Sequence, residues 1–276
     1  MRIDPLGTVM AAEISDVDLA ALLDTKVRQA IKRAMTEYLV LCFRDQTLEP
    51  AAFVDAARIF GSPKRFLLRQ DRIEGVPEVS IVSNRPPSFG GKPMVQAKHW
   101  HTDDSYLTEP ATVTLLQAKI LPGSGGDTEF INAYAALNSM PRALRCKIQG
   151  LRAVHRYESR RTVSRVAVRS AVELAETPEV DHPLVRTHPE SGSQTLYINP
   201  NRIDHILGWD ETASDALLGE IYAHALQPQF QYRHVWRPGD IVVWDNRCTL
   251  HRANADYDLS QPRIMHRVML EGQIPV

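Results

Sequence analysis

The sequence predicts a mainly β fold, a β-sandwich carrying peripheral helices, and three observations support this class. Helical patterns are concentrated early in the chain, at 24–38 and 49–60. Strands and helices do not alternate throughout, as the parallel sheet of an α/β protein requires. Short apolar or β-branched runs dominate the later part of the chain and are typical of strands, at 111–118, 127–131, 230–236, 241–244 and 264–270.

The first part of the chain is expected to form helices that cover one face of a sheet. Val27 and Ile31 recur at helical spacing after a capping residue at Asp24 or Thr25. The continuous apolar run 39–43 is typical of a buried strand. Pro50 then opens a second helix, because proline is tolerated in the first helical turn.

Two long regions are predicted to interrupt the strands. Residues 62–98 are rich in Pro, Gly and Arg, and we expect a loop, part of which forms a lid over the functional site. A disordered insertion is the alternative for this region. A helical insertion is expected at about 132–180, including a charged, solvent-exposed helix at 156–169. Segments 183–188 and 194–198 flank a glycine turn and predict a β-hairpin.

The composition is that of an ordinary globular protein, organised as a single domain over 1–276. Of its 276 residues 43% are hydrophobic, and a formal net charge of −1 gives no electrostatic footprint for nucleic acid. No apolar run is long enough to span a bilayer, and the N-terminus lacks the apolar core of a signal peptide. Three widely spaced cysteines are typical of free thiols in a reducing compartment. A cytoplasmic location without membrane association is therefore expected, and a homo-oligomer is compatible with the sequence.

The tripeptide His101-Thr102-Asp103 is a candidate metal-binding motif. Side chains two apart on a strand point the same way, so the imidazole of His101 and the carboxylate of Asp103 are expected to converge. With one more histidine they would form a 2-His-1-carboxylate triad, which holds Fe(II) on one face and leaves positions open for other ligands. A surface or helix-capping pair is the alternative, because a His-x-Asp tripeptide often occurs by chance.

Further motifs occur in an order typical of one enzyme family. They comprise the block 244–251, the run 262–267, Phe43-Arg44-Asp45-Gln46, Gly125-Gly126-Asp127-Thr128 and Val185-Arg186-Thr187-His188. With these motifs nearly the whole chain resembles the taurine dioxygenase/2,4-dichlorophenoxyacetate dioxygenase family of Fe(II)- and 2-oxoglutarate-dependent oxygenases. The resemblance implies a double-stranded β-helix, a cupin-like variant of the jelly roll.

The resemblance also implies three cofactors or cosubstrates, Fe(II), 2-oxoglutarate and O2. It assigns three residues to the metal and the catalytic centre, two to 2-oxoglutarate and three to the substrate. Matched onto this sequence, these are His101, Asp103 and His251 for the metal, Thr128 and Arg263 for 2-oxoglutarate, and Arg267, Tyr157 and Tyr197 for the substrate.

The chemistry of the arginines agrees with these roles. Alternate residues of a strand share a face, so Arg263 and Arg267 are expected to point the same way. A buried carboxylate needs a partner, and a guanidinium pairs with it through two hydrogen bonds without losing its proton. At strand rise the two positions are about 13 Å apart, so Arg267 is expected to bind a second anion, that of the substrate. Two arginines that reach out to water are the alternative.

The implied reaction hydroxylates a C–H bond of a small anionic substrate and releases succinate and CO2 from 2-oxoglutarate. A sulfonate, an alkyl sulfate, an aryloxy acid or an acylated amino acid is expected. Taurine itself is not, because positions near Phe66, Arg69 and Ala97 differ from those that contact taurine in the family. Desaturation or ring closure with the same triad is an alternative, as are a metal-dependent hydrolase using Zn(II) and a non-catalytic binding module.

Overall fold

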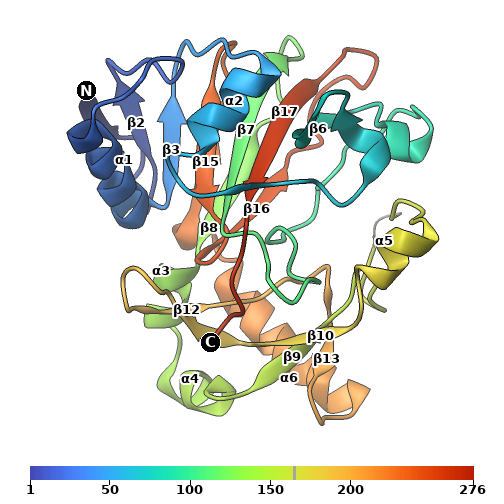
Figure 1. Ribbon diagram of the computed structural model, residues 1–276. Coiled ribbons are helices and arrows are strands. Elements are labelled where there is room, and N and C mark those ends of the chain that lie inside the picture. The colour runs from blue at the N-terminus through green and yellow to red at the C-terminus, as the bar shows by residue number, and fades with distance from the viewer. Residues whose placement is uncertain (164–165) are drawn as a thin grey trace.

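A computed structural model describes residues 1–163 and 166–276 (Figure 1). The largest sheet in this part of the chain has nine strands, and neighbouring strands pair antiparallel except β2 and β3. Its order is β1 (Arg2–Pro5), β2 (Ala12–Ser15), β3 (Val40–Phe43), β15 (Ile241–Asp245), β7 (Val113–Ile120), β17 (Ile264–Leu270), β6 (Val76–Ser83) and β5 (Arg72–Ile73), with β4 (Pro63–Lys64) also paired to β17.

Two helices cover one face of this sheet, as the sequence predicts. The helix α1 (Thr25–Tyr38) begins where the side chain of Asp24 accepts a hydrogen bond from the amide of Lys26, and it ends at Leu39, whose φ is 64°. The helix α2 (Pro50–Ala57) has Pro50 in its first turn. Their apolar faces bury with alternate residues of β3, β7, β15 and β17 in one hydrophobic core.

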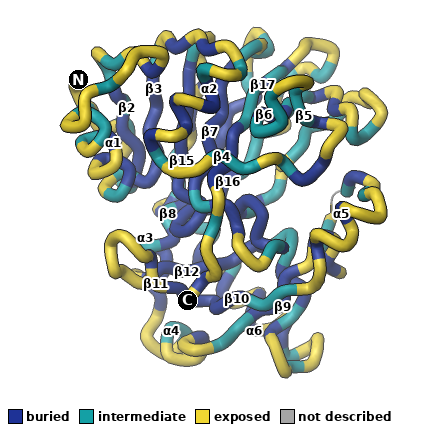
Figure 2. Tube along the Cα trace, viewed as in Figure 1, coloured by how far each residue is buried: buried dark blue, intermediate teal, exposed yellow. Residues whose placement is uncertain are grey.

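A smaller sheet faces the other side of the large one and closes the sandwich. It consists of β14 (Gln231–His234), β8 (Thr128–Asn132) and β16 (Thr249–Ala253). Phe130 of β8 packs against Trp244 of β15 at a ring-centroid distance of 5.5 Å. Leu116 and Met265 of the large sheet join the same buried core. This arrangement confirms the predicted β-sandwich, and Figure 2 shows the buried chain segments between the layers.

The rest of the chain forms a second, helix-containing region (Figure 1). Its strands form the sheet β10-β9-β13 and the hairpin β11-β12, the latter as the sequence predicts. The elements are α3 (Ala133–Asn138), α4 (Arg142–Ile148), β9 (Arg152–His155), α5 (Ala171–Ala175), β10 (Val180–Pro183), β11 (Val185–Thr187), β12 (Gln194–Leu196), β13 (Ile203–Ile206) and α6 (Glu211–Ala225), and the chain also has short 3-10 helices at Arg69–Asp71, Pro87–Phe89 and Pro228–Phe230. Among the described residues, no helix is both long and apolar enough to cross a membrane.

Several expectations about local structure were wrong. His101 lies on an isolated bridge to His251 and a turn follows it, so the motif is not carried by a continuous strand. The predicted loop 62–98 contains β6, which pairs along most of its length with β17. The helical insertion at 132–180 is interrupted by β9, and the described parts of 156–169 contain no helix. Residues 164–165 of that predicted helix lie outside the described residues.

Candidate active site

The side chains of His101 and Asp103 meet that of His251, which comes from a distant part of the sequence, between the two sheets. The amide of His101 donates to the carbonyl of His251 at 3.1 Å, and the amide of His251 donates to the carbonyl of His101 at 2.8 Å. Their Nε2 atoms lie 3.8 Å and 3.7 Å from the carboxylate oxygens of Asp103. These separations are too long for hydrogen bonds, and the three ligand atoms lie within 4.8 Å of one another. This is the spacing of ligands around one ion.

The protonation of the two histidines suits a metal. The Nδ1 of His101 donates to the carbonyl of His99 at 2.8 Å, which leaves the lone pair of Nε2 directed toward Asp103. Burial lowers the pKa of His101 and lowers that of His251 well below its usual value. Neutral imidazole is the form that binds a metal, so the residues present fit the Fe(II) that the family resemblance implies.

A hydrogen-bond network orients the carboxylate. Thr114 donates its hydroxyl to Asp103 at 2.7 Å, and Asn246 donates its amide group to that hydroxyl at 2.8 Å. The indole of Trp244 in turn donates to the side-chain oxygen of Asn246 at 3.0 Å. Thr102 is held by its own hydrogen bond to the carbonyl of Asn246 at 2.7 Å. The sequence predicts that a strand holds the His101-Thr102-Asp103 motif in place. In the structure this hydrogen-bond network holds Asp103 instead.

Arg263 is a buried cation beside the triad. Its Nε and Nη2 donate to the carbonyl of Gly126 at 3.1 Å and 2.9 Å, and no carboxylate of the described residues lies within ion-pair distance of it. Burial lowers its pKa, which means that the charge is poorly solvated. Arg263 lines a cavity of about 50 Å³ together with Thr128, His101, His251 and other residues, hereafter the Arg263 cavity. A buried guanidinium without an acid fits the far carboxylate of 2-oxoglutarate.

Thr128, which the resemblance assigns to 2-oxoglutarate, and Gly126 both lie near the guanidinium of Arg263. Thr128 lines the same cavity, and its hydroxyl accepts a hydrogen bond from the indole of Trp236 at 3.0 Å. Gly126 has a φ of +73°, and a Cβ there would lie 3.0 Å from the Nε of Arg263. The glycine motif therefore provides both the close approach of the backbone and the carbonyl that holds Arg263.

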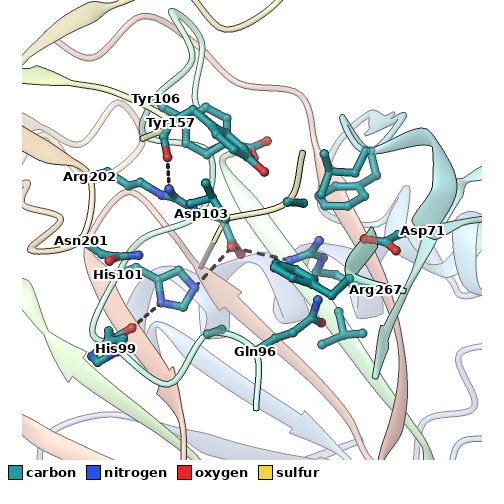
Figure 3. A pocket seen from close by; sticks show the side chains of 18 of the residues that line it. Asp71, Gln96, His99, His101, Asp103, Tyr106, Tyr157, Asn201, Arg202 and Arg267 are labelled. Atoms are coloured by element: carbon teal, nitrogen blue, oxygen red, sulfur yellow. Dashed lines mark hydrogen bonds and ion pairs between the residues drawn. The ribbon is translucent and has the colours of Figure 1, made fainter. Parts of the chain in front are cut away.

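A larger cavity of about 180 Å³, hereafter the Arg202 cavity, opens beside the triad. Arg267 lines both cavities and thus shares a face with Arg263, as predicted. Its Nη1 lies 3.9 Å from Asp103, its Nε donates to Ser80 at 3.3 Å, and its guanidinium lies 4.3 Å from the ring centroid of Phe66. Figure 3 shows this side chain directed toward Asp103. Tyr157, also predicted, lines the Arg202 cavity.

Comparisons with known proteins agree with this geometry. The family model described as "Taurine catabolism dioxygenase TauD, TfdA family" matches residues 2–269. The chain belongs to this family. The alpha-ketoglutarate-dependent 2,4-dichlorophenoxyacetate dioxygenase of Cupriavidus pinatubonensis is 36% identical to it over 96% of this chain and 95% of that protein. The alpha-ketoglutarate-dependent sulfate ester dioxygenase of Pseudomonas putida is 30% identical over 100% of this chain and 91% of its own.

Solved structures of the TauD/TfdA type share the fold. A taurine dioxygenase from Burkholderia xenovorans superposes with a TM-score of 0.85 at 31% identity, covering 100% of this chain and 90% of that one. A protein named AAD-2, solved with Mn(II) and N-oxalylglycine, gives 0.85 at 30% identity, covering 100% and 99%. The predicted jelly-roll class is therefore confirmed. The chain is an oxidoreductase of the alpha-ketoglutarate-dependent dioxygenase class, whose chemistry uses Fe(II), 2-oxoglutarate and O2.

Tyr197, unlike Arg267 and Tyr157, does not lie in the wall of a cavity beside the triad. It is buried and is not among the residues that line either cavity. Its ring packs against His155 and His182 at 6.1 Å and 5.8 Å, and the guanidinium of Arg186 lies 5.0 Å from its centroid. This position supports a packing role and gives no support to substrate contact.

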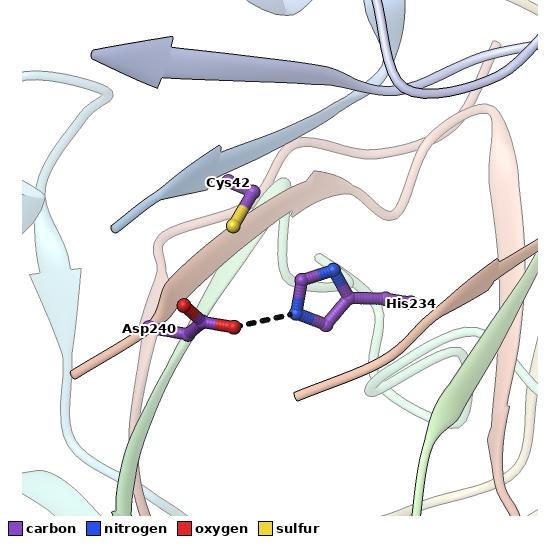
Figure 4. A group of neighbouring side chains, drawn as sticks. All are labelled: Cys42, His234 and Asp240. Atoms are coloured by element: carbon purple, nitrogen blue, oxygen red, sulfur yellow. Dashed lines mark hydrogen bonds and ion pairs between the residues drawn. The ribbon is translucent and has the colours of Figure 1, made fainter. Parts of the chain in front are cut away.

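Residues 1–163 and 166–276 contain two other buried groups of side chains that can bind metals. In one, Asp240 lies close to Cys42 and His234 (Figure 4). The Nε2 of His234 is 3.1 Å from Asp240, and Arg44 donates to the same carboxylate oxygen at 2.6 Å. A cation there would lie against a guanidinium, and burial raises the pKa of the Cys42 thiol. We interpret this group as a structural ion-pair network.

The second group is also satisfied internally. Asp245 accepts hydrogen bonds from His188 at 3.0 Å and from Arg247, which also binds Glu190 at 2.9 Å. These contacts hold the pKa of Asp245 well below its usual range. The block containing Asp245 and Arg247 thus supports the strand that carries His251, and the third member, Cys248, is buried.

Sequence reasoning missed several residues of the Arg202 cavity. Arg202 and Asn201 reach it from the turn before β13, and Asp71 reaches it from the short helix Arg69–Asp71. Phe66 and Ala97, flagged in the sequence as departures from taurine-binding positions, do line it. No local pattern marks Arg202, because its approach to the triad depends on how the second region packs beside the large sheet.

Proposed function

We propose that this enzyme hydroxylates a C–H bond of a small anionic organic substrate whose anion binds Arg267, with release of succinate and CO2. The observation that carries the proposal is a pair of inward-facing guanidinium groups on one strand face, Arg263 and Arg267, which line the cavities beside the triad. Arg263 is assigned to 2-oxoglutarate, so Arg267 is left for the substrate.

Within this proposal His101, Asp103 and His251 hold Fe(II), which when bound couples the oxidative decarboxylation of 2-oxoglutarate by O2 to oxidation of the substrate. Arg263 and Thr128 bind 2-oxoglutarate. Arg267 fixes the substrate anion beside Asp103, and Tyr157 forms part of the apolar wall. Positioning of this kind decides which C–H bond reacts. Where the hydroxylated carbon bears an ether or sulfate oxygen, the product collapses and releases that group.

The names of the relatives support an anionic substrate. They include dioxygenases for 2,4-dichlorophenoxyacetate, sulfate esters and (S)-phenoxypropionate. Aryloxy acids and alkyl sulfates are thus the first compounds to test, before sulfonates and acylated amino acids. A relative from Streptomyces avermitilis, 28% identical, is named pentalenolactone F synthase, so desaturation or ring closure is kept as the second candidate. A metal-dependent hydrolase binds no 2-oxoglutarate, so it gives no function to the buried guanidinium of Arg263.

The test measures succinate and oxidised product side by side over a panel of these compounds. We expect at least one class to give product in a one-to-one ratio with succinate. Arg267→Ala should retain 2-oxoglutarate binding and a slow, uncoupled release of succinate, but should lose product. If product stays coupled to succinate in Arg267→Ala with little change in KM, Arg267 has a structural role and the anionic substrate loses its main support.

A location in the cytoplasm and a homo-oligomeric state complete the proposal. The three cysteines are unpaired in the described structure, and Cys146 is exposed, which is compatible with a reducing compartment. Fractionation of cells and light scattering of the purified protein test the two points.

A further inference from the structure

The wall of the Arg202 cavity contains a second guanidinium in addition to Arg267. Arg202 lies over the rings of Tyr106 and Tyr157, at 5.4 Å and 4.9 Å from their centroids. The two rings meet edge to face at 4.9 Å. All three side chains line the cavity, and burial lowers the pKa of Arg202. In Figure 3 Arg202 and Arg267 lie on either side of Asp103.

The acidic side chains of this wall, Asp71, Asp103 and Asp104, form no ion pair with Arg202. Asp104 accepts the ammonium of Lys64 at 2.8 Å and the hydroxyl of Tyr106 at 3.0 Å. Asp71 accepts the amide of Ser88 at 3.0 Å. Within residues 1–163 and 166–276, no carboxylate lies within 4.0 Å of the guanidinium nitrogens of Arg202. A half-buried cation thus lacks an ion-pair partner, which a ligand can supply.

The hydrogen-bonding groups at this end of the cavity are also incompletely used. One nitrogen of Arg202 donates to the carbonyl of Tyr157. In the part of the chain that the structure describes, its other N–H groups have no protein acceptor. The N–H groups of a guanidinium that are not used by the protein are donors for an oxyanion.

We infer that the substrate carries a second oxyanion, of the carboxylate type, which binds Arg202 while its first anion binds Arg267. This inference rests on the proposed function and narrows its substrate class to molecules with an anion at each end of an apolar body. The apolar part of the cavity wall, which includes Phe66, Val166 and Ala167, receives that body.

The test compares matched compounds that differ only at the distal end. Phenoxyacetate is paired with para-carboxyphenoxyacetate and with its neutral analogue para-carbamoylphenoxyacetate, and hexyl sulfate is paired with its terminally carboxylated analogue. Binding is measured by anaerobic calorimetry on the full-length enzyme with Fe(II) and 2-oxoglutarate, and turnover is measured as oxidised product. We expect wild type to bind the carboxylated member of a pair about tenfold or more tightly, as for a hydrogen bond to a charged group, and to favour it by a similar factor in kcat/KM.

Variants show whether Arg202 causes this preference. Arg202→Met should abolish it with little effect on the compound without the second carboxylate, and Arg202→Lys should retain part of it. Arg169→Met is the matched control, because Arg169 also lies over the Tyr157 ring, at 4.1 Å, but does not line the cavity. It should keep the preference.

The outcomes separate this inference from the proposed function. Equal affinity for both members of each pair in wild type, or a preference that persists in Arg202→Met, would overturn the second oxyanion site and leave the proposed function standing. Failure of every compound to bind and to be oxidised would overturn the anionic substrate class, and the inference with it.

Discussion

Replacement of Arg263 by methionine gives the sharpest test of the cosubstrate site. Arg263 is 6% exposed, and the described residues offer its guanidinium two hydrogen bonds to the carbonyl of Gly126 but no acid. The distal carboxylate of bound 2-oxoglutarate would lose its counter-charge in Arg263→Met. Removing one partner of a buried ion pair costs roughly 3–5 kcal/mol. At about 1.4 kcal/mol for each tenfold change, the Kd for 2-oxoglutarate should rise by about two to three and a half orders of magnitude.

The unliganded protein should respond much less to this change. Loss of an unpaired buried charge is favourable, whereas the carbonyl of Gly126 loses its donors at a cost of about 1 kcal/mol, so the two effects offset each other. Anaerobic calorimetry with Fe(II) gives the Kd directly. Thermal unfolding provides a second readout, because 2-oxoglutarate should raise the Tm of wild type and not that of the variant.

Variants on the same strand supply the controls. Arg263→Lys keeps the charge but not the paired donors and should give an intermediate Kd. Arg267→Met changes the same strand face and should leave the Kd within about threefold. If Arg263→Met kept its affinity within about fivefold while Arg267→Met lost it, 2-oxoglutarate would be held by Arg267 and the assignment of the two cavities would be reversed.

Three further predictions concern the metal, the glycine motif and the interior histidines. Loss of any one ligand should abolish turnover and the visible charge-transfer band that Fe(II) and 2-oxoglutarate give without O2, whether by His101→Ala, Asp103→Ala or His251→Ala; normal activity would refute the assignment of that ligand. Gly126→Ala should raise the KM for 2-oxoglutarate more than it lowers kcat, because a Cβ at 3.0 Å displaces Arg263, and the reverse split in steady-state kinetics would contradict this. Burial lowers the pKa of His182 to about 4 and that of His155 well below its usual value. The unfolded chain therefore binds protons below about pH 6.5 that the folded protein excludes, and the free energy of unfolding should fall as the pH decreases from about 6.5 to 4. Denaturant titrations at several pH values should show a shallower slope for His155→Phe, and an unchanged slope would mean that His155 titrates normally in the folded protein.

The sequence by itself determined the elements whose signals are local. The helix after Asp24 follows from a capping side chain and an apolar spacing of three to four residues, and both occur in the structure. The shared face of Arg263 and Arg267 follows from the two-residue period of a strand, which β17 keeps. The motifs that contain His101 and His251 were recognisable as metal-binding motifs, because residue types and their order along the chain are enough to identify them.

Tertiary structure decided the features that depend on partners far away in the chain. The strand β6 has a weak apolar pattern and is flanked by Pro and Gly, and its pairing with β17 and β5 makes it a strand. Asp103 is oriented by Thr114 and Asn246, and His101 by its bridge to His251, none of which a local period encodes. Arg202 and Tyr197 show the same limit, because both come from the second region but only the packing of that region against the large sheet leaves Arg202 in the cavity and Tyr197 outside it. Local spacing in the sequence determines on which face of a strand or helix a side chain lies. Its distance from the triad is determined by contacts between segments that are far apart in the sequence, and no local pattern shows which segments these are.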